Sequence, residues 1–496
     1  MRKRIKILLV NLPWQKEGKW GVRAGSRWPH IKDAVEENYL PFPFFLAYAT
    51  ALLQKEGIET RIIDAIAEEI EEKEFLEKVS RINFDYLVAE TSIPSFYYDI
   101  NLLKKISALG IRIILCGPNI QICQEDFLSK NRFIDFVLCG EYEFTLLELV
   151  RCLQEGRIMS GVKGLIYREG EKIINTDRRP PFDINLLPWP ERDNLPMEKY
   201  LDAPGAMLTP SVQMVASRGC PFRCQFCLWP QVIYFGRHYR TRNIKDTVDE
   251  MEFLLREKGF KSVYFDDDTF NIGKERMLAF CREVIKRGLN KFQWAIMARA
   301  DLMDEEILEN MKKAGLWAVK YGIESANQRL LDNIQKDMNL KKAIRIVRLT
   351  NRLGIRTHLA FTFGLPGETE RTIKDTIELA QKLNPFSVQF SIMTPFPGTK
   401  YYEVLKQRGV DISDDLNLYD GNHVCFKSEG LSSSQLTTYK KIAYSKWRSS
   451  RDLKDNLKNK SKDLWFLLSQ RKFLDIILRA RSKFKAALEL FLGRYD

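Results

Sequence analysis

Three cysteines crowd into one short segment, Ser217-Arg-Gly-Cys220-Pro-Phe-Arg-Cys224-Gln-Phe-Cys227, and their spacing is suited to metal chemistry. Thiolates four and three positions apart on one loop can hold three corners of an iron–sulfur cubane. A [4Fe–4S] cluster takes four ligands, so a cluster held by three cysteines would leave one iron open to a small molecule. The sequence therefore predicts an open iron–sulfur site at Cys220, Cys224 and Cys227.

A zinc site is the alternative interpretation of the same cysteines. Structural zinc is held by four protein ligands at paired spacings, and the nearest fourth candidate is His238, one of four histidines in the chain. The other six cysteines are scattered and suggest no disulfide framework. The sequence shows no signal peptide and no apolar run of 18 residues. We therefore expect a cytoplasmic protein, whose reduced cysteines serve as ligands more often than as disulfides.

Further polar and glycine-rich segments follow predicted strands downstream of the cysteines. Phe265-Asp-Asp-Asp268-Thr-Phe270 places three acids together, and because burying them is costly we expect at least one to face solvent or a polar ligand. Gly364-Leu-Pro-Gly367-Glu368 has glycines that permit close backbone approach to a cofactor. Each segment alone is also typical of a solvated turn. Their shared order and their placement after the cysteine segment favour a common site.

The elements that must position these segments alternate between strands and helices. Six βα units indicate a parallel (β/α)6 partial barrel over residues 211–400, with its site at the carboxyl ends of the strands. The predicted strands are 213–216, 262–265, 293–298, 318–323, 357–363 and 387–393, and the predicted helices are 244–258, 274–287, 304–314, 340–353 and 370–383.

Residues 1–155 show a second alternation, which predicts a doubly wound, flavodoxin-like α/β domain. Ligands of such sheets lie beyond the carboxyl ends of the strands. Residues 156–210 are expected to form a linker with a small hairpin at 164–174, and residues 401–496 a C-terminal region. The candidate ligand contacts at the strand ends are Pro13, Asp64, Thr91, Ser92, Gly117, Pro118, Gly140 and Glu141.

In these motifs the chain resembles the radical S-adenosylmethionine (SAM) enzymes, whose CxxxCxxC motif has an aromatic residue, here Phe226, before the last cysteine. The resemblance implies that the open iron chelates SAM. Reductive cleavage then releases a 5′-deoxyadenosyl radical that abstracts hydrogen from the substrate. It also implies that the residues matching the family's later motifs contact SAM: Arg299, Glu324, Ser325, Gly364 and Glu368.

The resemblance extends to the cobalamin-binding class, which carries a doubly wound domain before the barrel. Asp267 and Asp268 match the FxDDxF element of that class, and the segment 21–29 looks similar to the branch acting on hopanoids and other lipids. Within that segment, Arg23, Arg27 and Trp28 are candidates for the interface between the domains. The implied third cofactor is cobalamin, bound at the strand ends of the first domain.

One departure from the cobalamin-binding pattern concerns the lower axial histidine. The DxHxxG motif is absent, because Asp64 is followed by Ala-Ile-Ala-Glu-Glu, and no histidine occurs between His30 and His238. We therefore expect no histidine ligand to cobalt from this domain unless His30 reaches it. The alternative is a docking domain that binds no cofactor.

By resemblance, the expected reaction is methyl transfer from cobalamin to an unactivated carbon of a lipid-like small molecule. A flavodoxin or ferredoxin is the expected electron donor. Oxidative cyclisation, ring rearrangement and carbon–carbon bond formation are alternatives within the same architecture. A cobalamin or iron–sulfur sensor without turnover is a further alternative, although a sensor has no need of SAM contacts.

The net charge of +13 suggests an anionic partner, but its distribution is uneven. Residues 440–496 contain 16 Lys and Arg against 6 Asp and Glu, a net of +10, which leaves +3 for the rest of the chain. The segment 463–492 is predicted to be a basic amphipathic helix, for which contact with an anionic membrane surface and packing on the barrel are the two main interpretations. Nucleic acid is not expected, because no appended oligonucleotide-binding domain is evident.

Overall fold

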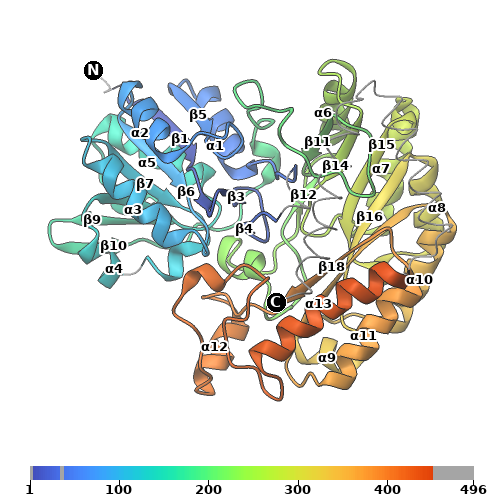
Figure 1. Cartoon of the computed structure of the whole chain (residues 1–496). Coiled ribbons are helices and arrows are strands. Elements are labelled where there is room, and N and C mark those ends of the chain that lie inside the picture. The colour runs from blue at the N-terminus through green and yellow to red at the C-terminus, as the bar shows by residue number, and fades with distance from the viewer. Residues whose placement is uncertain (1–3, 34–37, 124, 451–496) are drawn as a thin grey trace.

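The computed structural model describes residues 4–33, 38–123 and 125–450 of the chain. Two α/β units lie side by side, each built around its own sheet (Figure 1). The predicted basic helix at 463–492 lies outside the described residues.

The first unit contains a seven-stranded sheet in the order β10-β9-β8-β7-β6-β1-β5. Its five parallel strands confirm the doubly wound domain, and the direction of winding reverses between β1 and β6. That reversal is the point at which such sheets bind ligands. The parallel strands are β1 (Ile7–Asn11), β5 (Thr60–Asp64), β6 (Tyr86–Glu90), β7 (Arg112–Cys116) and β8 (Ile134–Leu138).

Helices cover the first sheet and bury its strands from both sides. They are α1 (Phe44–Lys55), α2 (Glu72–Arg81), α3 (Phe96–Ser107), α4 (Glu125–Lys130) and α5 (Glu143–Glu155). The hairpin predicted inside the linker, β9 (Leu165–Glu169) and β10 (Lys172–Asn175), instead extends the sheet, because β9 pairs antiparallel with β8. A small sheet absent from the prediction, β2 (Gln15–Lys16), β3 (Lys19–Val22) and β4 (His30–Ile31), precedes α1.

The second unit is the predicted six-stranded parallel partial barrel, in the order β11-β14-β15-β16-β17-β18. Its strands are β11 (Ser211–Met214), β14 (Ser262–Phe265), β15 (Gln293–Ala298), β16 (Leu316–Glu324), β17 (Arg356–Phe363) and β18 (Ser387–Ile392). Its helices are α6 (Ile244–Arg256), α7 (Lys274–Lys286), α8 (Glu305–Lys313), α9 (Gln328–Asn333), α10 (Leu340–Arg352) and α11 (Glu370–Leu383).

The two faces of the barrel sheet differ in polarity, as the two-residue period of strands allows. Outward side chains such as Val319, Leu359 and Phe390 are buried with the helices in one apolar core. Residues of the opposite face, such as Lys320 and His358, are only partly buried although they lie in the middle of neighbouring strands. The inner face of the barrel therefore carries polar and charged side chains beside a small apolar cluster that includes Tyr264, Ala295 and Ala318.

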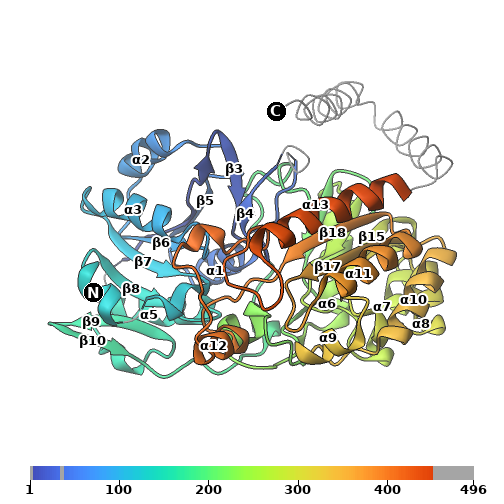
Figure 2. The same ribbon diagram turned by 60° about the horizontal axis from the view of Figure 1, so that its bottom comes forward.

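The C-terminal region packs on the barrel through two helices, α12 (Lys400–Gln407) and α13 (Ser433–Ser450). Helix α13 lies along β18 and α11 in both ribbon views (Figures 1 and 2), and it buries Leu436, Ala443 and Trp447. The change in charge at Lys440 is thus no structural boundary, since Lys440 lies in the middle of α13.

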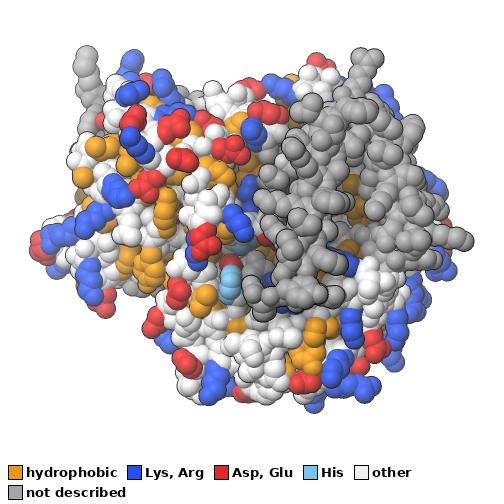
Figure 3. Space-filling view, in the orientation of Figure 1, with side chains coloured by type: hydrophobic (Ala, Val, Ile, Leu, Met, Phe, Trp, Pro, Cys, Tyr) orange, Lys and Arg blue, Asp and Glu red, His pale blue; other side chains and the backbone are white. Residues whose placement is uncertain are grey.

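The surface visible in Figure 3 carries Lys, Arg, Asp and Glu side chains in close mixture over the described residues. Such mixing agrees with the small net charge of the chain before Lys440. Among the described residues, none of the helices combines the length and hydrophobicity needed to span a bilayer.

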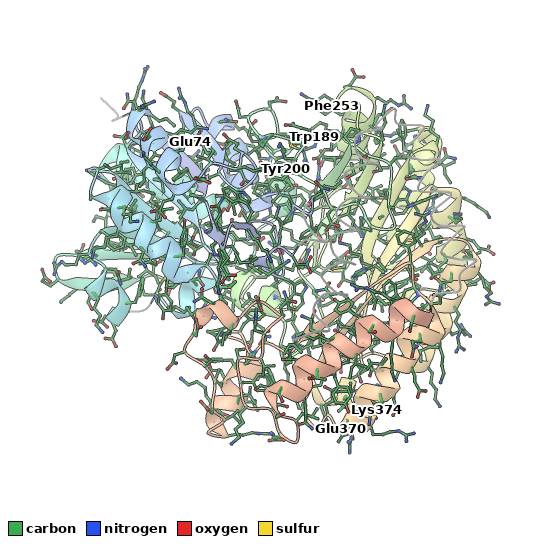
Figure 4. All side chains as sticks on the ribbon, in the orientation of Figure 1. Glu74, Trp189, Tyr200, Phe253, Glu370 and Lys374 are labelled. Carbon is green, nitrogen blue, oxygen red and sulfur yellow. The ribbon has the colours of Figure 1, made fainter. Side chains whose placement is uncertain are left out.

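A buried ion-pair network joins the two units. Arg218, which follows the first barrel strand, lies 2.6 Å from Glu143 and 3.1 Å from Glu141 of the first unit. Its guanidinium also lies over the rings of Phe45 and Tyr48 in α1, 4.8 Å from each ring centroid. A second contact is the hydroxyl of Tyr200, which donates to Asp64 at 2.9 Å; Figure 4 shows Tyr200 between the two units.

We expect Arg218→Met to destabilise the protein by about 3–5 kcal/mol, because the fully buried carboxylate of Glu143 would lose its partner. Chemical denaturation measures the free energy of unfolding. The control is Arg81→Met, which removes an exposed contact with Glu77 and should cost less than about 1 kcal/mol. Equal losses for the two variants would contradict the importance of the buried network.

Candidate functional site

The three predicted ligand cysteines lie on one loop at the carboxyl end of the first barrel strand. The loop begins after β12 (Ser217–Arg218) and ends at a π-helical turn over Trp229–Ile233. Cys220, Cys224 and Cys227 are partly exposed, whereas the other six cysteines are buried. Burial of the loop raises the pKa of all three thiols, so a ligand that takes them as thiolates must displace protons.

The amide of Gln231 holds the cysteine loop in shape. Its Nε2 donates to the carbonyls of Cys227 at 2.7 Å, Gln225 at 3.1 Å and Cys224 at 3.3 Å. Its Oε1 accepts from the N–H of Lys400 at 2.7 Å, which ties the loop to the start of α12. This role of Gln231 was missed by sequence reasoning, because a glutamine four positions after a cysteine has no distinctive pattern.

Glycine is required directly before the first cysteine. Gly219 has φ +87°, and a Cβ there would meet the carbonyl oxygen of His238. Its N–H donates to Asp268 at 2.9 Å. The backbone of His238 therefore packs against Gly219. The side chain of His238 is exposed and supplies no fourth ligand for the zinc alternative.

The three cysteines supply the donor set of a [4Fe–4S] cluster with one open iron. Within the described part of the chain, no group of three or more His, Cys, Asp or Glu side chains is arranged to hold one metal ion. Ligands of a cubane bind separate corners and need not converge on one point. Three accessible thiols on a single loop therefore suit a cluster with one open iron.

Three charged side chains gather beside Cys224. The Nζ of Lys336 donates to Glu324 at 2.9 Å, and Thr362 donates to the other oxygen of Glu324 at 2.7 Å. Arg299 donates to the carbonyl of Lys336 at 2.7 Å. The positive charges of Lys336 and Arg299 act on Cys224 to favour its thiolate, against the effect of burial. Arg299 and Glu324 were predicted from motifs, whereas Lys336 lies in a loop without a motif and was missed.

Of the three aspartates after β14, Asp266 and Asp267 are buried and Asp268 is partly buried, and all three accept hydrogen bonds within the protein. That at least one of them faces solvent or a polar ligand stays a prediction. Asp267 accepts from the N–H of Ala216 and from Ser217. Asp268 accepts from Gly219 and from the hydroxyl of Tyr234, both at 2.9 Å. The partners are supplied mainly by the cysteine loop and its flanks, so Asp267 and Asp268 position that loop.

The third acid, Asp266, binds across the interface between the units. Arg27 of the first unit donates to its carboxylate at 2.6 Å and to its carbonyl at 2.7 Å. Arg27 also reaches Asp268 at 3.3 Å. The charge of the triplet is therefore offset inside the protein, which is what makes its burial tolerable.

The remaining predicted SAM contacts lie at the same end of the barrel but are occupied by local contacts. Glu368 is buried and accepts from the N–H groups of Gly364 and Leu365, so it closes its own loop. Ser325 is buried beside Thr376, 3.4 Å between hydroxyl oxygens, and Phe226 packs at the edge of the apolar core.

A cavity lies between the carboxyl ends of the strands of the first unit and the segment that follows Cys227. The predicted residues Thr91, Ser92, Gly117, Pro118 and Gly140 line it, and so do Arg23 and Arg27. Residues that sequence reasoning missed complete its wall: Gly25, Ser26, Pro29, Phe45, Glu90, Tyr142, Leu228, Trp229 and Ile233. Their signal was not visible in the sequence, because the wall is assembled from both units.

The glycines of the cavity wall permit close approach of the backbone. A Cβ on Gly117, at φ +113°, would meet the carbonyl oxygen of Thr91 at 2.4 Å. A Cβ on Gly140 would meet the ring of Phe235 at 2.6 Å and the carbonyl oxygen of Ile233 at 2.8 Å. Gly140 therefore lets the first unit dock on the segment after the cysteines.

Three predicted contacts of the first domain lie elsewhere. Asp64 is buried with hydrogen bonds from Asn11, Tyr200 and the N–H groups of Ile66 and Ala67, so it caps a turn. Glu141 is paired with Arg218 and with Arg240, and Pro13 is buried outside the cavity wall.

His30 is likewise no part of the cavity wall. Its Nδ1 lies 2.6 Å from the carbonyl oxygen of Trp28, and its ring stacks on Tyr39. The expectation that this domain gives cobalt no histidine ligand unless His30 reaches it stays a prediction.

Glu368 predicts a pH dependence of stability. Burial raises its pKa to about 8, against 4.5 as the ordinary value. Between these two values the unfolded chain has lost a proton that the folded chain keeps, so rising pH favours unfolding, by up to about 4 kcal/mol at pH 8. Glu368→Gln should abolish this loss, measured as the free energy of unfolding between pH 5 and pH 8.

The control for that measurement is Glu370→Gln, two residues further along. Glu370 is exposed, and Figure 4 shows it next to Lys374 on α11. Hydrogen bonds from Tyr439 and Lys374 lower its pKa. The stability of this variant should still fall between pH 5 and pH 8, and identical pH profiles for Glu368→Gln and the unchanged protein would contradict the prediction.

Comparison with known proteins agrees with this geometry. Residues 214–380 match the model of the radical SAM superfamily. The chain is 30% identical over 406 residues to an uncharacterized methyltransferase of Pyrococcus horikoshii, which covers 81% of this chain and 86% of the relative. It is 29% identical over 391 residues to the anaerobic magnesium-protoporphyrin IX monomethyl ester cyclase of Rubrivivax gelatinosus, over 75% and 67% of the two chains.

The fold is shared with a solved structure, the radical SAM methyltransferase TsrM from Kitasatospora setae bound to tryptophan and a SAM analogue. The TM-score is 0.69 at 19% identity, over 91% of this chain and 90% of TsrM. A second structure of TsrM, with cobalamin and a [4Fe–4S] cluster bound, matches with a TM-score of 0.67. The cysteine loop, the partial barrel and these similarities together show that the chain belongs to the radical SAM superfamily.

Proposed function

We propose that this protein is a cobalamin-dependent radical SAM enzyme that transfers a methyl group to a carbon of a small molecule. One observation carries the proposal: the cavity at the carboxyl ends of the strands of the first unit is walled in part by Leu228, Trp229 and Ile233, which lie on the segment that follows Cys227. A cofactor in that cavity and a cluster on the cysteine loop would therefore be neighbours across one short segment.

The residues of the cavity suit cobalamin. It lies at the reversal point of a doubly wound sheet, where such folds bind cofactors. Phe45 and Trp229 stack at 5.5 Å between ring centroids and supply apolar surface, whereas Thr91 and Ser92 supply hydroxyl groups. TsrM, which shares the fold, has been solved with cobalamin and a cluster bound, and the relative from Pyrococcus horikoshii is named a methyltransferase.

Each part of the chain has a role in this proposal. Cys220, Cys224 and Cys227 hold the cluster, and Gln231 keeps their loop in shape. Arg299 and Lys336 place positive charge beside the thiolates. Glu324, a predicted SAM contact, accepts a hydrogen bond from Lys336 and so orients it. The bound cofactors would supply a SAM-derived radical and a transferable methyl group.

In this proposal the substrate binds on the inner face of the barrel. Lys320 pairs there with both oxygens of Asp202 at 2.8 Å, and His358 and Gln389 lie on neighbouring strands of the same face. These residues favour a substrate that carries polar groups. The lipid-like substrate, a flavodoxin or ferredoxin as donor, and membrane contact through residues 463–492 stay predictions from the sequence.

The first experiment tests the radical chemistry. Protein reconstituted anaerobically with iron and sulfide, given SAM and dithionite, should form 5′-deoxyadenosine. Cys224→Ala should abolish both the cluster absorbance and this product, because one corner of the cluster loses its ligand. Cys425→Ala, a substitution at a buried cysteine far along the chain, should keep both. Metal analysis that finds zinc alone, or clustered protein that forms no 5′-deoxyadenosine, would refute the proposal.

Oxidative cyclisation is the second candidate reaction, because one relative is a cyclase. Expression in cells fed methionine with a deuterated methyl group separates the two outcomes by mass spectrometry of the small-molecule extract. Methyl transfer predicts a product that carries the label and depends on Cys224. An unlabelled product that depends on Cys224 would favour cyclisation or another rearrangement instead. The Cys224→Ala variant is the matched control.

A further inference from the structure

The cavity between the units is bordered by one carboxyl group, that of Glu90. Glu90 is the last residue of β6, which borders the reversal point of the first sheet. Among the described residues of the cavity wall, it is the only one with a carboxyl group. The other ionic side chains of the wall are engaged elsewhere: Arg23 with Asp99 and Leu12, and Arg27 with Asp266.

Glu90 is held on one side only. Its Oε2 accepts from the hydroxyl of Tyr142 at 2.7 Å. Within the described part of the chain, no hydrogen-bond donor reaches its Oε1. The side chain is more than nine-tenths buried, with 8% of the residue exposed, and it borders the cavity. Oε1 is not among the buried side-chain atoms that lack a partner, so it is open to the cavity, where a ligand can supply its hydrogen bond.

The surroundings of Glu90 combine several titratable groups. Tyr142 and Glu143 come from the start of α5, Cys116 from the end of β7, Arg23 from the segment after β3, and Asp64 from the end of β5. Burial raises the pKa of Glu90 to about 7, the Tyr142 hydrogen bond and Arg23 lower it, and Glu143 and Asp64 raise it. The carboxyl therefore changes charge near neutral pH.

None of the four histidines, all of which lie in the described part of the chain, lines this cavity. His30 contacts Trp28 and lies outside the wall, and His238 is exposed. A carboxylate that accepts a hydrogen bond can stabilise water as an axial ligand of cobalt, whereas a protonated carboxyl cannot accept in the same way.

We propose that Glu90, oriented by Tyr142, is the residue of this chain that faces the axial position of a bound cobalamin and sets whether the cobalt carries an axial water. The inference rests on the proposed function, since it needs cobalamin in the cavity. Ionised Glu90 favours the axial water, and neutral Glu90 favours cobalt without it. Glu90 is a positioning residue, because it acts on the cobalt through water.

The test uses the full-length protein with its cluster, loaded with hydroxocobalamin, freed of excess by gel filtration and reduced to the cobalt(II) form. Electron paramagnetic resonance and absorption spectra distinguish cobalt(II) with an axial oxygen ligand from cobalt(II) without one. They are recorded from pH 6 to pH 8 for the unchanged protein, Glu90→Gln and Tyr142→Phe. The control is Glu68→Gln, an exposed position of the same unit outside the cavity.

We expect the fraction of cobalt with an axial ligand to rise from pH 6 to pH 8 in the unchanged protein and in Glu68→Gln. Glu90→Gln should bind the same amount of cobalamin and lose this pH dependence. Tyr142→Phe should shift the midpoint to higher pH, because the carboxylate loses the hydrogen bond that stabilises it. A merely structural role of the pair would produce neither effect.

Two results would overturn the inference in distinguishable ways. If cobalamin is retained but Glu90→Gln keeps the pH dependence, or the unchanged protein shows none, the role of Glu90 is refuted and the proposed function stands. If no cobalamin is retained, both are refuted. Should Glu90→Gln fail to fold, the shifted midpoint of Tyr142→Phe decides, and an unshifted midpoint would refute the role of Glu90.

Discussion

The arrangement of the molecule depends on the buried guanidinium of Arg218. This side chain leaves the barrel two residues before Cys220, pairs with Glu141 and Glu143, and lies over Phe45 and Tyr48. If the units were displaced, the guanidinium of Arg218 and the carboxylates of Glu141 and Glu143 would be buried without partners. Such ion pairs therefore favour a single arrangement of the two units. These contacts of Arg218 thereby fix the start of the cysteine loop against the carboxyl ends of the strands of the first unit.

The chemistry follows from that placement. The segment after Cys227 becomes a wall of the cavity, and the aspartates after β14 bind the cysteine loop on one side and Arg27 on the other. The cysteine loop, the cavity at the strand ends of the first unit and the ion pairs of the interface thus form one connected region. A cofactor in the cavity and a cluster on the loop would share supporting residues, so a substitution at the interface would disturb both sites.

Much of the fold was predictable because its signals are local. Alternating apolar strands and amphipathic helices gave both sheets, and the cysteine spacing located the loop to the residue. The sequence could not show contacts whose partners lie far along the chain. Arg27, about 240 positions away, pairs with Asp266 and Asp268, and Tyr200 donates a hydrogen bond to Asp64.

The sequence by itself determined the two α/β units and the loop of three thiols, since strand period, helix period and ligand spacing are written in consecutive residues. Only the tertiary structure decided which strand-end residues share a cavity. Thr91, Ser92 and Gly140 line it, Asp64 and Glu141 do not, and Glu90 was not anticipated. The physical reason is that burial, and with it the charge state and the hydrogen-bond partners of each polar group, depends on how the second unit covers the first.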